Sequence, residues 1–138
     1  MTIPQAIKQW LYKNPSIEID ERIDTEILDS QAIAYALSKN PTNTKEVFVD
    51  GSELRTEYYT FFARQNSQLE TERISNDKFL EDLENWIFER NFEGDLPVLD
   101  NKRYCDSVEI SQGYYLFEND ENESVYSLTI QITYRKEI

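Results

Sequence analysis

The sequence predicts an α+β fold, in which a mainly antiparallel, mixed sheet of about five strands carries two helices packed on one face. Apolar residues recur at the spacing of one helical face near residues 3–11 and 75–90, whereas other segments alternate apolar and polar residues as strands do. The order helix, strands, helix, two strands is typical of this class. A length of 138 residues with only three Gly and four Pro indicates a single domain over residues 1–138, without a flexible linker.

The N-terminal region is predicted to form one helix and two strands. The helix begins after Thr2 and ends at residues 14–15, an Asn-Pro pair. Residues 16–24 alternate Ile with charged residues, which predicts a half-buried strand. Residues 30–39 are ambiguous, because their Ala content favours a helix while their alternation favours a strand, and the strand is preferred. The helical stripe consists of Ile3, Ile7, Trp10 and Leu11.

The middle of the chain is predicted to form a hairpin. Residues 40–45 indicate a turn by their Asn, Pro and Thr content, and a short strand over residues 46–49 follows. Asp50 and Gly51 then indicate a hairpin turn, because Gly tolerates the positive φ that such turns require. Within the run at residues 53–65, residues 54–63 are predicted to form a central strand, since both faces become apolar after Glu57.

The C-terminal half is predicted to form a helix and a second hairpin. Residues 65–75 are expected to be a polar connection, and a helix over residues 75–90 is expected to begin at a Ser75 or Asn76 cap and to stop at Gly94. Two strands follow, residues 105–118 and 124–136, joined by an acidic turn. The last strand alternates so regularly that one face is expected in the core and the other mostly in water.

Charge and cysteine content limit the function classes. Fourteen basic residues against 27 acidic ones give a net charge of −13, which should repel nucleic acid, so no specific nucleic-acid binding is expected. Cys105 is alone, which excludes an intramolecular disulfide and fits a reducing compartment. The first 13 residues are too polar for a signal peptide, and no apolar run reaches membrane-spanning length, so no membrane partner is expected.

No catalytic constellation is visible in the sequence. The chain has no His, and its isolated glycines match neither phosphate-binding motif, so catalytic triads, His-based metal sites and nucleotide cradles are not expected. The acids Glu93, Asp95 and Asp100, or the pair Asp82 and Glu89, could hold a hard cation or act as acid and base. In a chain with 27 acids such groups arise by chance, and we predict solvated charge, no catalytic, metal or cofactor residues, and no enzyme activity.

An aromatic strand end is the strongest candidate for a protein interface. Tyr114, Tyr115 and Phe117 lie beside the acidic turn at residues 118–123. Such aromatic area is either tucked under a helix or presented to a partner, and the sequence favours neither alternative. Leu96 and Leu99, in the connector after the long helix, are the other candidate interface residues.

Three stretches, residues 47–64, 79–100 and 108–136, resemble in their order a protein family from phages and prophages of Gram-positive bacteria, whose members are labelled minor capsid, tail completion or tail terminator proteins. The resemblance rests on a Val-Asp-Gly turn at residues 49–51, Leu-Pro-Val-Leu at 96–99, Gly-Tyr-Tyr-Leu-Phe at 113–117 and a terminal basic pair at 135–136. Ser52 stands where the family often has a second Gly. About two-thirds of the chain is covered, and the first 45 residues match only in arrangement.

The resemblance implies a structural virion protein of a long-tailed phage or prophage. Tail terminators are small α+β subunits that form a ring, usually a hexamer, which caps the tail tube and later meets the head. The implied partners are copies of the chain itself, the major tail tube protein and the head–tail connector protein, and no cofactor is implied. The implied location is the head-proximal end of the tail, after assembly in the bacterial cytoplasm.

Two other classes stay open. An acidic inhibitor or immunity-type protein would bind a basic partner through carboxylates aligned on one face. A carboxylate-dependent hydrolase or metal enzyme would bring two or three acids together in a pocket. Two alternatives also stay open for the connector after the long helix, which could pack inside its own subunit or contact the next subunit of a ring.

Overall fold

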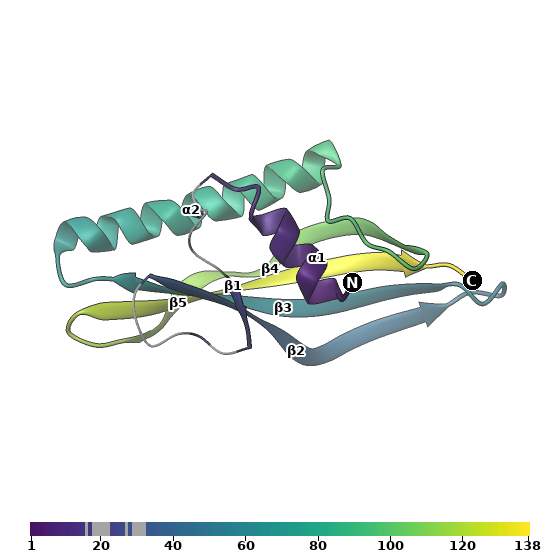
Figure 1. Cartoon of the computed structure of the whole chain (residues 1–138), viewed down its shortest axis with the longest axis horizontal. Coiled ribbons are helices and arrows are strands. Elements are labelled where there is room, and N and C mark those ends of the chain that lie inside the picture. Colours follow the sequence, from purple (N-terminus) through teal and green to yellow (C-terminus); the bar gives the residue numbers. More distant parts are fainter. Residues whose placement is uncertain (16, 18–22, 27, 29–32) are drawn as a thin grey trace.

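The computed structural model describes residues 1–15, 17, 23–26, 28 and 33–138. It has an α+β fold with a five-stranded sheet in the order β1-β2-β3-β5-β4, which confirms the predicted class (Figure 1). The β1 strand pairs in parallel with β2, and every other pairing is antiparallel. The elements are α1 (Ile3–Leu11), β1 (Ile23–Thr25), β2 (Ala34–Val47), β3 (Glu53–Asn66), α2 (Glu70–Glu93), β4 (Arg103–Asn119) and β5 (Glu123–Lys136).

The first helix forms where the sequence predicts it. Thr2 caps α1 by accepting a hydrogen bond from the Gln5 backbone N–H at 3.3 Å, and the Gln5 side chain accepts from the Thr2 N–H at 2.8 Å. Proline in the first turn leaves no helical hydrogen bond unmade. The apolar stripe is buried, so α1 is held by packing against the rest of the core.

The second strand is longer than predicted, and the turn predicted at residues 40–45 is wrong. β2 continues to Val47, so residues 46–47 of the separate strand expected at residues 46–49 belong to it, and residues 48–49 lie in the hairpin turn. Its register against β3 shifts between Lys39 and Asn43, which places Pro41 at an irregularity of the ladder where a missing N–H is tolerated. The strand predicted over residues 16–24 lies largely outside the described residues, apart from Ile17 and, in β1, Ile23 and Asp24; residues 30–32 also lie outside them.

The hairpin turn between β2 and β3 confirms the prediction. The Phe48 N–H donates to the Ser52 carbonyl at 2.9 Å, and Gly51 has a φ of 91°. Asp50 stabilises the turn by accepting hydrogen bonds from the Ser52 N–H at 2.9 Å and from the Ser52 hydroxyl at 2.6 Å. The serine at this position therefore contributes to the turn through its own side chain.

The second helix begins before its predicted start, so the polar connection expected at residues 65–75 is wrong. The Leu69 N–H donates to the Glu72 carboxylate at 2.9 Å, and the Arg73 guanidinium donates to the Ser67 carbonyl at 2.7 Å, which fixes the first turn without a Ser or Asn cap. Asn76 lies inside α2, where its side chain donates to the Asn66 carbonyl at 2.9 Å. The predicted stop is confirmed, since Gly94 takes a left-handed C-cap conformation with a φ of 77°.

The last strand is buried on both faces, so the prediction of a wet face is wrong. Val125, Ser127 and Thr129 are each less than 10% exposed. β5 lies between β3 and β4 in the sheet, and Ser127 pairs with the much larger Phe62 of β3 and Tyr115 of β4. Burial of a polar strand face therefore follows from the central position of β5 rather than from its own composition.

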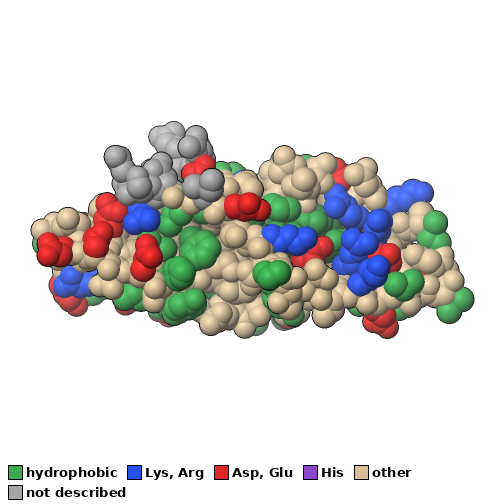
Figure 2. Space-filling view, turned by 90° about the horizontal axis from the view of Figure 1, so that it is seen from below, with side chains coloured by type: hydrophobic (Ala, Val, Ile, Leu, Met, Phe, Trp, Pro, Cys, Tyr) green, Lys and Arg blue, Asp and Glu red, His purple; other side chains and the backbone are tan. Residues whose placement is uncertain are grey.

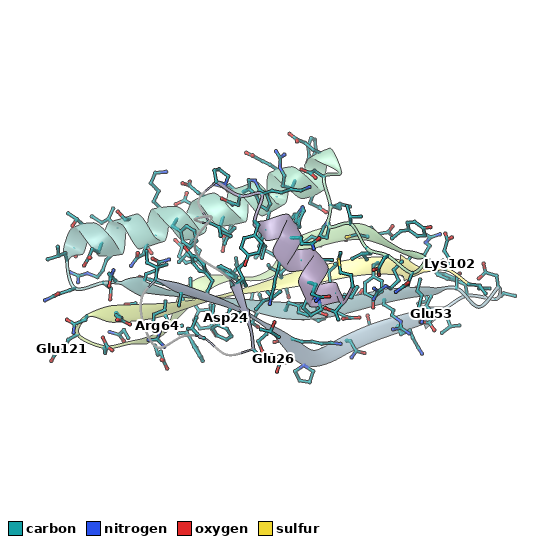
Figure 3. All side chains as sticks on the ribbon, in the orientation of Figure 1. Asp24, Glu26, Glu53, Arg64, Lys102 and Glu121 are labelled. Atoms are coloured by element: carbon teal, nitrogen blue, oxygen red, sulfur yellow. The ribbon has the colours of Figure 1, made fainter. Side chains whose placement is uncertain are left out.

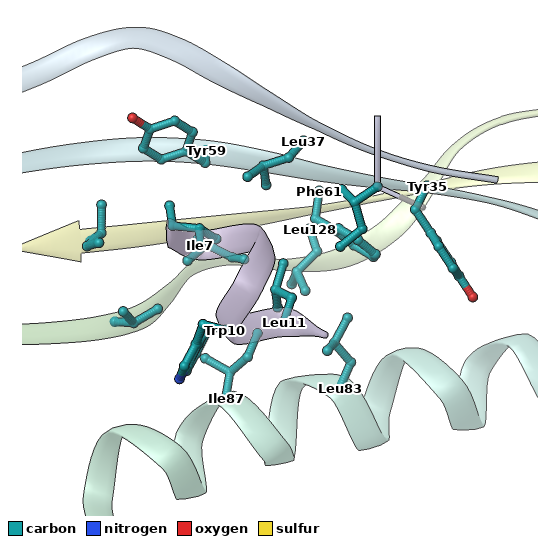
Figure 4. Close-up of a cluster of buried hydrophobic side chains, with 14 of the residues drawn as sticks. Ile7, Trp10, Leu11, Tyr35, Leu37, Tyr59, Phe61, Leu83, Ile87 and Leu128 are labelled. Carbon is teal, nitrogen blue, oxygen red and sulfur yellow. The ribbon is translucent and has the colours of Figure 1, made fainter. Parts of the chain in front are cut away.

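Both helices pack on one face of the sheet around a single core, shown in Figure 4. Trp10 of α1 lies against Trp86 of α2, with ring centroids 4.9 Å apart, and its indole N–H donates to the Asp95 carbonyl at 2.7 Å. These contacts join α1, α2 and the connector at one point. The largest completely buried side chains are Trp10, Tyr59, Tyr134, Phe61, Ile7, Leu11, Leu37, Leu80, Leu83, Ile87, Leu128 and Ile130.

Candidate functional site

Three aromatic side chains form an exposed patch on the sheet face opposite the helices. Phe62 follows the core residue Phe61 on β3 and therefore points away from the helices. Its ring centroid lies 5.3 Å from that of Phe117 on β4, which lies 6.5 Å from that of Tyr115. Tyr115 is 44% exposed and Phe117 is 49% exposed. We call Phe62, Tyr115 and Phe117 the aromatic patch.

The remaining aromatic candidate, Tyr114, lies on the other side of β4. Its ring packs against the core, and its backbone N–H donates to the Glu84 carboxylate of α2 at 2.6 Å. Burial, reinforced by the nearby carboxylates of α2, raises the pKa of the Tyr114 phenol. The three aromatic candidates of β4 therefore lie in two environments. Tyr114 packs against α2, whereas Tyr115 and Phe117 are exposed to solvent.

The connector between α2 and β4 packs inside the chain. Leu96 and Leu99 both lie against the core, and Pro97 between them is buried. Val98 is 76% exposed and points outward. The two leucines thus anchor the connector to its own subunit, and the structure does not bring them to the aromatic patch.

The connector acids pair with cations. Asp95 binds Lys13 at 3.2 Å, and Glu93 binds Arg90 at 3.0 Å. The N-terminal amino group, with help from Arg103, lowers the pKa of Asp100. Among the described residues, no three His, Cys, Asp or Glu side chains come together in a way that could hold a metal ion.

A cleft that the sequence analysis did not anticipate opens between the start of α1 and strands β2, β3 and β5. It has a volume of about 750 Å³. Its walls carry Lys39, Arg55, Arg103 and Lys136, together with the N-terminal residue, so positive groups dominate a surface of a chain whose net charge is −13. In Figure 2, Lys and Arg side chains gather toward the right of the view, the side on which Figure 1 shows the β2–β3 hairpin. We call this cavity the basic cleft.

A buried carboxylate lies in the wall of the basic cleft. Glu57 is 7% exposed, accepts a hydrogen bond from the Tyr59 hydroxyl at 2.7 Å and another from the Tyr134 hydroxyl, and lies 3.4 Å from the Lys39 ammonium. Burial alone would raise the pKa of Glu57, but these three partners outweigh it and hold the pKa below its ordinary value of 4.5. Glu57 is therefore a fixed anion that orders the cleft wall.

The cations of the cleft differ in how fully they are paired. Arg55 binds Glu53 at 2.6 Å, and Arg103 binds Asp100 at 2.7 Å. Within the described part of the chain, the Lys136 ammonium has no carboxylate within 4 Å. The cleft therefore keeps an excess of positive charge and an available ammonium group.

The one thiol of the chain is not placed for nucleophilic chemistry. Cys105 lies on β4 with its sulfur 3.6 Å from the Ser107 carbonyl oxygen, and burial raises its pKa to about 12. A thiol of this pKa is almost entirely protonated at neutral pH. Of the helices that the structure describes, none combines the length and the apolar character needed to cross a membrane.

No family model matches the sequence, and a comparison with curated proteins finds no similar protein.

Proposed function

We propose that this protein is a structural subunit of a phage or prophage tail, a terminator-like protein that caps the tail tube as a ring and joins it to the head connector. The observation that carries the proposal is the aromatic patch, because it leaves large apolar side chains exposed on a sheet face that neither helix covers. Aromatic side chains are enriched at the centres of protein interfaces. Such a surface is what we expect of a subunit whose role is assembly and not catalysis.

The arrangement of the fold supports a ring-forming role. A cyclic ring larger than a dimer needs two different surfaces on each subunit, one for each neighbour. The aromatic patch lies on the free sheet face, whereas the basic cleft opens beside α1, on the side of the sheet that carries the helices. One subunit thus offers two distinct surfaces of different chemistry. The net charge of −13 would also limit adhesion of DNA passing through the ring.

The test is complementation of a phage or prophage that lacks this gene. Electron microscopy of particles made without the protein is expected to show tails of uncontrolled length that fail to join heads, and the wild-type gene restores both features. The double variant Tyr115→Ser/Phe117→Ser is expected to fold but to restore neither feature. The matched control is Val98→Ser, which removes an exposed apolar side chain outside the patch and should restore both.

Two results would contradict the proposal. Tails of normal length with normally attached heads in the absence of the protein would exclude a terminator role. Full complementation by the patch variant would show that the exposed aromatic residues have no part in assembly. Isolation of a stoichiometric complex with a basic host protein would instead favour the inhibitor alternative, in which the exposed acids of α2, such as Asp77 and Glu81, would face that partner.

A further inference from the structure

We infer that the basic cleft of one copy binds the acidic tip of the β4–β5 hairpin of a second copy, so that subunits associate head to tail. This inference rests on the ring-forming part of the proposed function and names the contact that would join neighbouring subunits. The acidic tip consists of Glu118, Asp120, Glu121 and Glu123.

Two acids of the tip are occupied within their own subunit. Asp120 accepts hydrogen bonds from the backbone N–H groups of Asn122 and Glu123, each at 2.8 Å, which shapes the turn. Glu123 lies 3.6 Å from the guanidinium of Arg64. These residues build the tip and hold it rigid.

The other two acids are available to a partner. Glu118 and Glu121 are exposed, and neither side chain forms a hydrogen bond or ion pair with any residue in the described ranges. Two carboxylates thus project from a rigid turn without internal partners. Their desolvation is unfavourable unless the surface that covers them supplies positive charge.

The basic cleft supplies that charge. Five positive groups in its lining, the side chains of Lys39, Arg55, Arg103 and Lys136 and the N-terminal amino group, face one carboxylate, Glu57. Two more carboxylates, Glu53 and Asp100, pair with them at short distance. Positive charge therefore remains in excess, and the volume of about 750 Å³ is large enough to admit the end of a β-turn.

The acidic tip lies at one end of the long axis, whereas the basic cleft extends from the middle of the molecule toward the other end. Figure 3 labels Glu121 at one end and Glu53 and Lys102 at the other. A contact between the tip and the cleft joins two different surfaces, so it is heterologous and leaves an unused tip and an unused cleft on every pair. Contacts of this kind add further subunits until a ring closes, whereas a symmetric contact would stop at a dimer.

The test is sedimentation velocity of the purified full-length chain over a concentration series up to about 1 mM, at low and high salt. Reversible association is expected, weaker at 1 M salt, where the screening length falls to about 3 Å. The variants Glu118→Gln/Glu121→Gln and Lys136→Glu should each weaken association about tenfold, since each removes or reverses exposed ion pairs. The control Glu81→Gln/Glu89→Gln, on α2, changes the net charge by the same amount as the tip variant and should associate like the wild type.

Two complementary variants test the pairing directly. Glu118→Lys/Glu121→Lys reverses the charge of the tip but keeps the cleft, whereas Lys136→Glu cancels the excess positive charge of the cleft but keeps the acidic tip. Each alone is expected to associate more weakly than the wild type. Their equimolar mixture should form a dimer that does not grow, because the acidic tip of one variant still meets the basic cleft of the other, while the Lys-bearing tip finds no excess charge in the altered cleft. All these residues are exposed, so circular dichroism and melting temperature should match the wild type.

Three results would overturn the inference. The first is a wild-type chain that stays monomeric at every concentration and salt tested. The second is association that none of the tip or cleft variants weakens. The third is association that the patch variant Tyr115→Ser/Phe117→Ser abolishes while the charge variants leave it intact. The third result would leave the proposed function standing, because tail length and head joining are measured separately by microscopy.

Discussion

Replacement of Glu57 by Gln is expected to destabilise the fold by about 2 kcal/mol at pH 7. The carboxylate accepts hydrogen bonds from the Tyr59 and Tyr134 hydroxyls, and a hydrogen bond to a charged group contributes about 1 kcal/mol more than one between neutral groups. A Gln side chain has nearly the same shape, but only its amide oxygen can accept from a tyrosine hydroxyl, while its NH2 group must donate to the other one. Two hydrogen bonds to a charged group thus become neutral ones, each weaker by about 1 kcal/mol. For a domain of this size the melting temperature should fall by about 6–10 °C.

The pH dependence gives this prediction a second readout. Since the pKa of Glu57 lies below 4.5 in the folded chain, its ionised form stabilises the fold above the pKa of the unfolded chain. That contribution is lost as the pH falls from about 4.5 through the pKa of the folded state. The free energies of unfolding of the wild type and of Glu57→Gln should therefore converge in this acid range, while they stay well separated at pH 7.

The assay is urea unfolding of both proteins at several pH values between 7 and 3, followed by circular dichroism. Glu89→Gln, which neutralises an exposed acid of α2, is the control for the charge change and should unfold like the wild type at pH 7. The reasoning is wrong if Glu57→Gln melts within about 2 °C of the wild type at pH 7. It is also wrong if the difference between the two proteins stays constant down to pH 3.

Three further variants or reactions test separate parts of the structure. Gly94→Ala should lower stability in urea by about 1 kcal/mol, because a φ of 77° strains a residue with a Cβ although no atom crowds the site. Trp10→Phe should cost about 1–2 kcal/mol in thermal unfolding, because it leaves the Asp95 carbonyl without its indole donor. Cys105, with a pKa of about 12, should react with a thiol reagent at pH 8 far more slowly than a free thiol does, and urea should restore the rate.

Local signals were sufficient to predict most of the fold. The stripe of α1, the turn at Gly51 and the stop at Gly94 depend on a few neighbouring residues, and each formed as predicted. The extension of β2 through Pro41 depends instead on pairing with β3, because the partner strand supplies hydrogen bonds that turn-forming residues lack on their own. The buried second face of β5 likewise follows from its neighbours in the sheet.

The candidate surfaces were predicted only in part. Alternation cannot separate Tyr114 from Tyr115 and Phe117 in advance, because β4 has register shifts on both sides of this segment. The basic cleft is even harder to predict from the sequence, because its cations come from four different strands. They are Lys39, Arg55, Arg103 and Lys136. A single sequence contains no signal of the register that brings them together, and the net charge of −13 points away from such a site.

The aromatic patch and the acidic tip are neighbours at the β4–β5 hairpin. Phe117 of the aromatic patch directly precedes Glu118 of the acidic tip, so one end of the subunit combines exposed apolar area with available carboxylates. Salt at 1 M screens the carboxylates but leaves apolar burial intact. Association between subunits should therefore weaken in high salt without disappearing, whereas binding of a basic partner through the acids of α2 alone would be lost. This difference in salt response separates the tail-subunit proposal from the inhibitor alternative.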